Sequence, residues 1–170
     1  TNFSMECILQ TLEGTADFGS SVSATISRNG DLVGRLWFDV GIDRNDLTGA
    51  GLQYANWTNN TGHAFVKDCE VEIGGQRIDR HYSQWLDVWN ELTDHDGNER
   101  SLINKHSAKN AYLKSNTSAT TPPSLRMYVP LKFWFNRNPG LALPLIALQY
   151  HEVKVKLTTR SLLALLNSNN

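Results

Sequence analysis

The residue types that bind metals or act in catalysis are scattered along this chain. Its histidines share no spacing typical of a metal site. The sequence contains no nucleophile elbow, no Walker loop and no His-Glu-x-x-His motif. It therefore predicts no catalytic residue, no metal site and no cofactor, and thus a protein that is not an enzyme. The histidines are His63, His81, His95, His106 and His151.

One short stretch is rich in side chains with oxygen atoms, the ligands that calcium prefers. Its members are Asp94, Asp96, Asn98 and Glu99. Gly97 comes too early for an EF-hand loop, and the stretch directly follows a predicted helix, where Asp, Asn and Gly are expected. We therefore favour helix termination over a calcium site.

Several aromatic residues are candidates for a platform that binds sugars or bases. Their spacing also fits packing on a sheet, and we favour a place in the core. These residues are Trp85, Trp89, Phe133, Trp134 and Phe135.

Two cysteines, Cys7 and Cys69, are too few for a disulfide framework and lack the paired spacing of a zinc site. Each has apolar neighbours in the sequence. We therefore predict two buried free thiols in an intracellular protein rather than a disulfide bond.

Length and charge set further limits on function. A chain of 170 residues is long enough for one domain with a substantial core. Sixteen basic and seventeen acidic residues give a net charge of −1, which predicts no direct binding of nucleic acid or of an anionic membrane. The sequence contains no signal peptide and no membrane span. We expect that both chain ends are cut or processed.

Alternating polar and apolar residues predict antiparallel strands. Residues 1–12 are expected to form one strand. Residues 20–40 predict a hairpin, because Asn29 and Gly30 are the preferred pair for a two-residue turn. A second hairpin is predicted over residues 63–80, with its turn at Gly74 and Gly75.

One amphipathic helix is predicted over residues 83–93, with Ser83 as its N-cap. Its apolar residues recur at three- and four-residue spacing and predict a single apolar face. They are Trp85, Leu86, Val88, Trp89 and Leu92.

The last third of the chain predicts two more strands. A long strand is expected over residues 124–135, at an edge or a bulge because of Pro130. After a break at residues 138–140, the apolar block 141–148 predicts a tight buried loop or short helix that leads into a strand. In that strand, polar and apolar residues alternate, with Tyr150, Val153, Val155 and Leu157 among charges. Residues 41–62 and 100–123 predict long connections.

Together these elements predict an all-β antiparallel domain of seven or eight strands, with long loops and one amphipathic helical insertion. A β-sandwich and a jelly roll are both candidates, because the pattern alone does not determine the strand order.

Several stretches of this chain resemble the major capsid proteins of large icosahedral double-stranded DNA viruses of eukaryotes. This nucleocytoplasmic group includes chloroviruses and iridoviruses. The strongest resemblance lies in residues 138–157. The other stretches are residues 34–38, residues 72–78 followed by Tyr82 and the predicted helix, and residues 129–135.

The resemblance implies an antiparallel jelly-roll sandwich and a structural virion protein. It implies that residues 1–160 form the first half of a double jelly roll, and that residues 161–170 begin an interdomain linker or are a truncated end. The family forms homotrimers, which are pseudo-hexameric capsomers. These contact neighbouring capsomers and minor capsid proteins and build an icosahedral shell over an internal membrane that they do not span.

The resemblance also places the protein in the virion capsid, after assembly in the host cytoplasm. We therefore do not expect secretory glycosylation at the four sequons, which lie in predicted loops or chain ends. We expect the two long connections to make the main capsomer or exterior contacts. The alternative function is a jelly-roll carbohydrate-binding module; a cupin-type enzyme would need a His-x-His motif that is absent. The sequons begin at Asn2, Asn56, Asn59 and Asn116.

Overall fold

The structure is a computed structural model of the 170-residue chain. It describes residues 3–43, 55–94, 97, 99, 101–103 and 124–168, and the fold is built from these ranges. Most of the two long connections predicted at residues 41–62 and 100–123 lies outside them.

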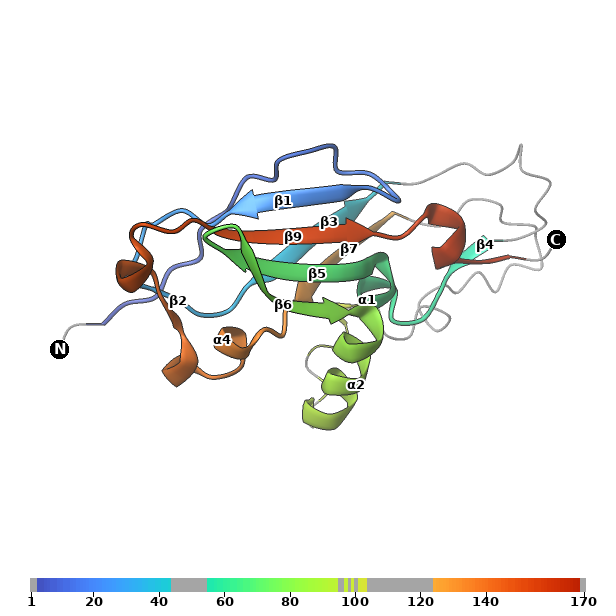
Figure 1. The fold of residues 1–170 in the computed structure, drawn as a ribbon. Helices are drawn as coiled ribbons and strands as arrows, with labels where there is room; N and C mark the ends of the chain where they lie inside the picture. The colour runs from blue at the N-terminus through green and yellow to red at the C-terminus, as the bar shows by residue number, and fades with distance from the viewer. Residues whose placement is uncertain are drawn as a thin grey trace.

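A four-stranded antiparallel sheet forms one layer (Figure 1). Its spatial order is β1-β9-β5-β6, so that β1 and β6 are its edge strands. The register joins Ala24 of β1 to Val155 of β9, and Val155 to Val71 of β5. The strands are β1 (Ser21–Thr25), β9 (Val153–Thr159), β5 (Val66–Ile73) and β6 (Gln76–Tyr82).

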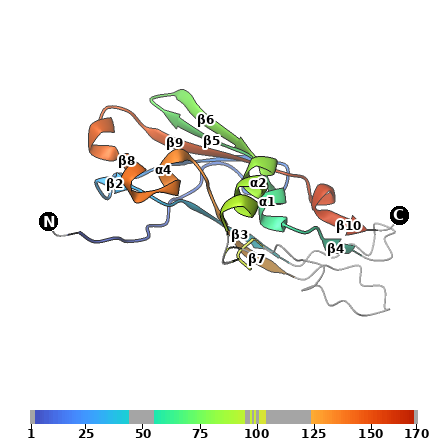
Figure 2. The same cartoon turned by 90° about the horizontal axis from the view of Figure 1, so that it is seen from below.

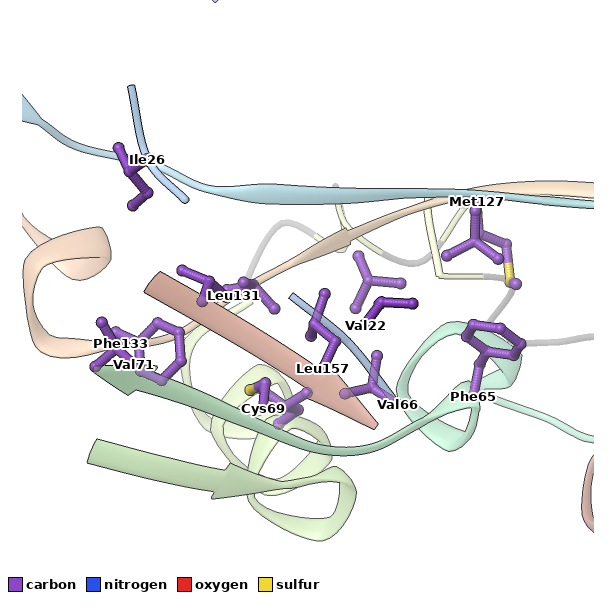
Figure 3. Close-up of a cluster of buried hydrophobic side chains, with 14 of the residues drawn as sticks. Val22, Ile26, Phe65, Val66, Cys69, Val71, Met127, Leu131, Phe133 and Leu157 are labelled. Atoms are coloured by element: carbon purple, nitrogen blue, oxygen red, sulfur yellow. The ribbon is translucent and has the colours of Figure 1, made fainter. Parts of the chain in front are cut away.

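The second layer contains β3 (Trp37–Ile42) paired antiparallel with β7 (Leu125–Pro130). Figure 2 shows this pair on one side of the molecule and β5, β6 and β9 on the other. Side chains from both layers meet in one buried apolar cluster, of which Figure 3 shows a part. The described chain is therefore a two-layer β-sandwich. Core members include Val22, Val66, Cys69, Val71, Val155 and Leu157 from the first layer, and Val40, Ile42, Met127 and Val129 from the second.

Short elements close the ends of the sandwich. Two further antiparallel pairs are β2 (Leu32–Val33) with β8 (Leu143–Pro144) and β4 (Ala55–Trp57) with β10 (Leu166–Ser168). The helices are α1 (Thr61–Phe65), α2 (Ser83–Thr93) and α4 (Trp134–Arg137), with 3-10 turns η2 (Pro139–Leu141), η3 (Leu145–Leu148) and η4 (Leu162–Leu165). In the described chain, no helix is long and apolar enough to span a membrane.

The hairpin predicted over residues 20–40 is wrong. β1 pairs with β9, whereas β3 pairs with β7 in the other layer. Neither Asn29 nor Gly30 has the positive φ that the expected turn needs. The segment between β1 and β3 instead crosses from one layer to the other, because Val22 and Val40 enter the common core from opposite sides.

The strand predicted over residues 1–12 is also wrong for the residues that the structure describes. Residues 3–12 contain no strand. The next residue, Glu13, forms an isolated antiparallel bridge with Ser23. Cys7 is consequently exposed rather than buried. Cys69, in contrast, is a buried free thiol as predicted.

The second hairpin is confirmed. β5 and β6 are joined by a turn at Gly74 (φ 59°) and Gly75 (φ 81°), backbone angles that glycine adopts without strain. Its first strand begins at Val66, since residues 61–65 form α1.

Helix α2 has the predicted range, but Ser83 is not its N-cap. Tyr82 occupies the cap position, and the Ser83 hydroxyl accepts a hydrogen bond from the Arg160 guanidinium at 2.7 Å. The helix ends at Thr93, as predicted, where the backbone N–H of Asp94 donates to the carbonyl of Asn90.

The predicted long strand at residues 124–135 stops earlier. β7 ends at Pro130, and α4 begins at Trp134. Among the described residues, β7 pairs with β3 alone in its sheet, which places Pro130 on an edge strand as expected. The apolar block after residue 140 forms β8 and short 3-10 turns that lead into β9, as expected, but it is only partly buried: Leu143 and Leu145 are buried, whereas Leu141 and Ile146 are exposed. Val153, Val155 and Leu157 are buried in β9, whereas Tyr150 lies before the strand and is exposed.

Residues 161–168 pack against the sandwich. Leu165 of η4 is fully buried, and β10 pairs with β4. The division of a longer protein at residue 160 stays a prediction.

Candidate assembly surface

Exposed apolar side chains lie in several parts of the described chain, and two groups of them are close together in the sequence. The first is the N-terminal arm, defined as residues 3–12, in which Phe3 is 77%, Met5 80% and Leu9 90% exposed. The second is the outer face of α2, formed by Trp85, Val88 and Leu92. Contiguous apolar surface of this kind is typical of sites where proteins associate.

Helix α2 buries only part of its predicted apolar face. Leu86 is fully buried, whereas Trp85, Val88 and Leu92 are exposed. Residues three, four and seven apart share one side of a helix, so these three form a stripe, and Leu86 lies on the adjoining side. The predicted apolar face is therefore buried only along one margin, at Leu86.

An arginine partly covers the aromatic end of this stripe. The rings of Trp85 and Trp89 lie 5.6 Å apart, and the Arg137 guanidinium carbon lies 4.3 Å from the centre of the Trp89 ring. Arg137 comes from α4, so this cation–π contact connects α4 with α2. The aromatic prediction is thus only partly confirmed, since Phe133 and Phe135 are in the core but Trp85 is 37% exposed.

A polar cluster lies beneath α2. The Glu99 carboxylate contacts the Lys132 ammonium at 2.7 Å and accepts a hydrogen bond from the Asn90 amide, also at 2.7 Å. His63 of α1 is buried, and its Nδ1 lies 3.6 Å from the carboxylate of Asp87. Burial lowers the pKa of His63, although Asp87 and Glu99 act in the opposite direction. The cluster therefore holds a neutral histidine where α1 and α2 meet.

The remaining histidines do not assemble a site. His81 is buried, stacks on Phe133 at 4.9 Å, and has its pKa lowered by burial even though Asp79 lies 3.1 Å away. His151 is exposed, and residues 95 and 106 lie outside the described ranges. Among the residues that the structure describes, no group of three possible ligands is placed to hold a metal ion.

The possible calcium stretch is only partly described, since residues 96 and 98 are not. Within it, the Glu99 carboxylate is paired with Lys132, and the Asp94 carboxylate accepts a hydrogen bond from the Glu99 backbone N–H at 3.3 Å. Both described members thus have protein partners. The helix ends here, as the favoured interpretation requires.

The outward face of the four-stranded sheet carries charges of both signs. Lys156 contacts Glu72 at 2.5 Å, and Arg80 contacts Asp68 at 3.3 Å and Glu70 at 3.1 Å. Cross-strand pairs of this kind stabilise a sheet modestly. They neutralise one another locally, and this face therefore lacks the excess of positive charge that nucleic-acid binding needs.

The sequons are placed unevenly. Residues 2 and 116 lie outside the described ranges. Asn59 is exposed in a turn, as expected, whereas Asn56 lies in β4 rather than in a loop.

Sequence reasoning missed both apolar surfaces because it assumed that alternating or helical apolar residues face the core. The sequence contains more apolar segments of this kind than two layers of a domain of this length can bury, and this excess could have indicated exposed apolar surfaces.

Comparison with known proteins identifies the family. A family model described as the major capsid protein N-terminus matches residues 1–169. The major capsid protein of Pyramimonas orientalis virus is 48% identical over 160 residues, which cover 92% of this chain and 38% of that protein. The major capsid protein of Paramecium bursaria Chlorella virus 1 is 38% identical over 169 residues, which cover 99% of this chain and 36% of that protein. The chain thus spans well under half the length of these relatives.

Solved structures identify the fold. The crystal structure of PBCV-1 VP54, fitted into a reconstruction of the virophage Sputnik, matches 95% of this chain and 36% of its own, with a TM-score of 0.73 and 38% identity. The Faustovirus major capsid protein matches 99% of this chain and 45% of its own, with a TM-score of 0.60; at 12% identity it supports the fold alone. The sandwich is therefore the predicted jelly roll.

These findings confirm the resemblance noted in the sequence, and they do not favour the carbohydrate-binding alternative. The family model covers almost every residue, and the identity to its viral members reaches 48%. The chain belongs to the family of major capsid protein N-terminal domains.

Proposed function

We propose that this chain is the N-terminal jelly roll of a major capsid protein, and that the protein's function is to build an icosahedral viral shell. One observation carries the proposal: 95% of the chain superposes on a quasi-atomic model of the PBCV-1 virus capsid, with a TM-score of 0.73 and 38% identity. The role is structural, and the protein is not an enzyme.

The unit of assembly is a homotrimer that acts as a pseudo-hexameric capsomer. In this proposal a second jelly roll follows the one described, and the boundary lies near residue 160. The rigid sandwich supplies the geometry, and burial of exposed apolar surface supplies the driving force. Closed three-fold symmetry limits growth of the single capsomer.

The remaining partners follow from the same role. Capsomers contact one another and minor capsid proteins in the virion, after assembly in the host cytoplasm, and they lie near an internal membrane without spanning it. Direct contact with nucleic acid is not part of the function; the charge balance of the outward sheet face supports this.

The test is the native mass of the full-length source protein, measured by light scattering after size exclusion. A stable trimer of a chain more than twice as long as this one is expected. A monomer of about this chain's mass would overturn the proposal.

A second experiment tests the long connections at residues 41–62 and 100–123. Replacing either with a short Gly-Ser linker is expected to leave the domain folded and to reduce the trimer yield. An unchanged yield would count against their role in contacts.

A further inference from the structure

Helix α2 lies over buried polar atoms that have no hydrogen-bond partner. Among the described residues, such side-chain atoms occur in Asn60, His63, His81 and Asn90. Asn60 and His63 lie at α1, which both views place beside α2 (Figures 1 and 2). His81 lies at the end of β6, just before α2 begins, and Asn90 belongs to α2 itself. Buried polar atoms are normally paired, so their grouping at one helix sets this contact apart from the rest of the domain.

His63 faces the middle of α2. Its side chain is 1% exposed, and its Nδ1 lies 3.6 Å from a carboxylate oxygen of Asp87, too far for a hydrogen bond. The same oxygen accepts a hydrogen bond of 2.9 Å from the Asn60 amide. The other charged groups that act on this imidazole are Glu99 and Lys132, which are paired with each other at 2.7 Å. No hydrogen bond to an acid therefore favours a proton on this imidazole while α2 is in place.

His81 faces the first turn of α2. Its ring lies 6.2 Å from the Trp85 ring and 4.9 Å from the Phe133 ring, and the residue is 7% exposed. Its Nε2 lies 3.1 Å from the Asp79 carboxylate, whereas its Nδ1 has no partner. The guanidinium of Arg137 opposes a positive charge on this ring. A second buried imidazole thus lies under the same helix.

Both histidines are neutral while α2 is in place. Burial lowers the pKa of His63 and of His81, although the carboxylates of Asp87 and Asp79 act in the opposite direction. Cys69, opposite His81 on β5, adds no charge because burial raises the pKa of its thiol to about 12. If α2 moves away, the two imidazoles enter water and regain the ordinary pKa of 6.5.

The attachment of α2 allows it to move without the sheet. In the described chain, α2 has no backbone hydrogen bond to a strand, and its fully buried apolar side chain is Leu86. The Ser83 hydroxyl accepts one hydrogen bond from Arg160. β5, in contrast, pairs along its length with β6 and β9. Elements held by side chains alone open at a lower free-energy cost than central strands.

We propose that α2 is a pH-sensitive lid over His63 and His81, which opens in mild acid while the two-layer sandwich stays folded. Phe65 keeps α1 on the sandwich, because it lies in the core and stacks on Phe38 at 6.3 Å. In the open state both imidazoles are hydrated and bind a proton, whereas the closed state requires them to be neutral. The helix also carries the exposed stripe of the candidate assembly surface, so its opening moves that stripe. The inference goes beyond the proposed function and does not depend on it.

Hydrogen–deuterium exchange of the full-length source protein at about pH 7.5 and about pH 5.5 tests the lid. Protection factors correct for the intrinsic pH dependence of exchange, and they are compared for the amides of α2 and of β5. Over this interval, one histidine with a pKa of 6.5 in the open state favours opening by at most about tenfold, and two by at most about a hundredfold. The protection of α2 is expected to fall by more than about tenfold and to stay below that of β5 at both pH values.

Two results of this exchange experiment would overturn the proposal. Equal protection of α2 and β5 would show that the helix opens only when the whole domain unfolds. Weaker protection of α2 without pH dependence would show that its opening does not expose the histidines.

Variants assign the effect to the two imidazoles. His63→Gln and His81→Gln each remove one titrating group and are expected to limit the pH effect on α2 to at most about tenfold; the double variant is expected to abolish it. His151→Gln, at an exposed position, is the matched control and is expected to keep the wild-type dependence. Wild-type pH dependence in the double variant would also overturn the proposal. If these variants do not fold, the comparison of α2 with β5 in the wild-type protein still decides it.

Discussion

Acidification is expected to destabilise this protein through His63. The side chain is 1% exposed where α1 meets α2, and burial lowers its pKa from the ordinary value of 6.5. On unfolding, the imidazole enters water and regains that ordinary value. Protons therefore bind the unfolded chain more readily than the native protein at mildly acidic pH.

The sign and size follow from linkage. A histidine whose pKa is lowered in the folded state does not change the free energy of unfolding well above pH 6.5. As the pH falls below that value, the free energy of unfolding decreases until the native histidine is itself protonated. The slope for one such group is at most about 1.4 kcal/mol per pH unit. Between about pH 7.5 and about pH 5.5, the free energy of unfolding therefore falls by at most about 1.4 kcal/mol because of His63.

The assay is urea unfolding of the wild type and of His63→Gln at both pH values. The variant is expected to lose less stability on acidification, whatever its stability at neutral pH. His151→Gln, at an exposed position, is the control and is expected to retain the wild-type pH dependence. If His63→Gln and the wild type show the same pH dependence, the imidazole is not held neutral by burial and the reasoning is refuted.

Three further predictions rest on other parts of the fold. Burial raises the pKa of Cys69 to about 12, so the native protein is expected to react with a thiol reagent at Cys7 alone. A second thiol should become reactive only on unfolding, and two reactive thiols in the native protein would contradict this. Leu86→Ala is expected to lower the free energy of unfolding by about 2–5 kcal/mol, whereas Leu92→Ala on the same helix should change it by less than about 1 kcal/mol. Chemical denaturation of both variants measures these losses. A larger loss for Leu92→Ala would contradict the burial of Leu86. In Gly62→Ala the new Cβ would lie 3.0 Å from the Cα of Ile103, so a loss of about 1–3 kcal/mol is expected; Gly41→Ala has open space and serves as the control, and equal melting temperatures for the two variants would rule out this close packing.

Local pattern predicted the elements whose partners are close in the sequence. The turn at Gly74 and Gly75 joins β5 and β6 directly, and the adjoining strands need no information from elsewhere in the chain. The range of α2 was likewise predictable, since an apolar period of 3.6 and a terminating Asp-rich stretch are local signals. The resemblance to viral capsid proteins was equally a property of the sequence.

The failures share one cause. Alternation indicates that a strand has an apolar side, but it does not indicate which surface that side meets. The sequence around Asn29 and Gly30 suits a tight hairpin, yet β1 gains its partner from β9, more than a hundred residues later, and β3 from β7. The arm shows the same limit: its alternation predicted a strand, whereas residues 3–12 form none and Phe3, Met5 and Leu9 are exposed.

The sequence by itself thus determined most of the strand-forming segments, the range of the helix and the family, because periodicity, turn residues and motifs are local properties of the chain. The tertiary structure alone decided which strands pair, which side of α2 is buried and which apolar residues remain for association. The physical reason is that burial depends on the sum of contacts between distant segments, and two layers of sheet have room for only part of the apolar surface that the chain carries.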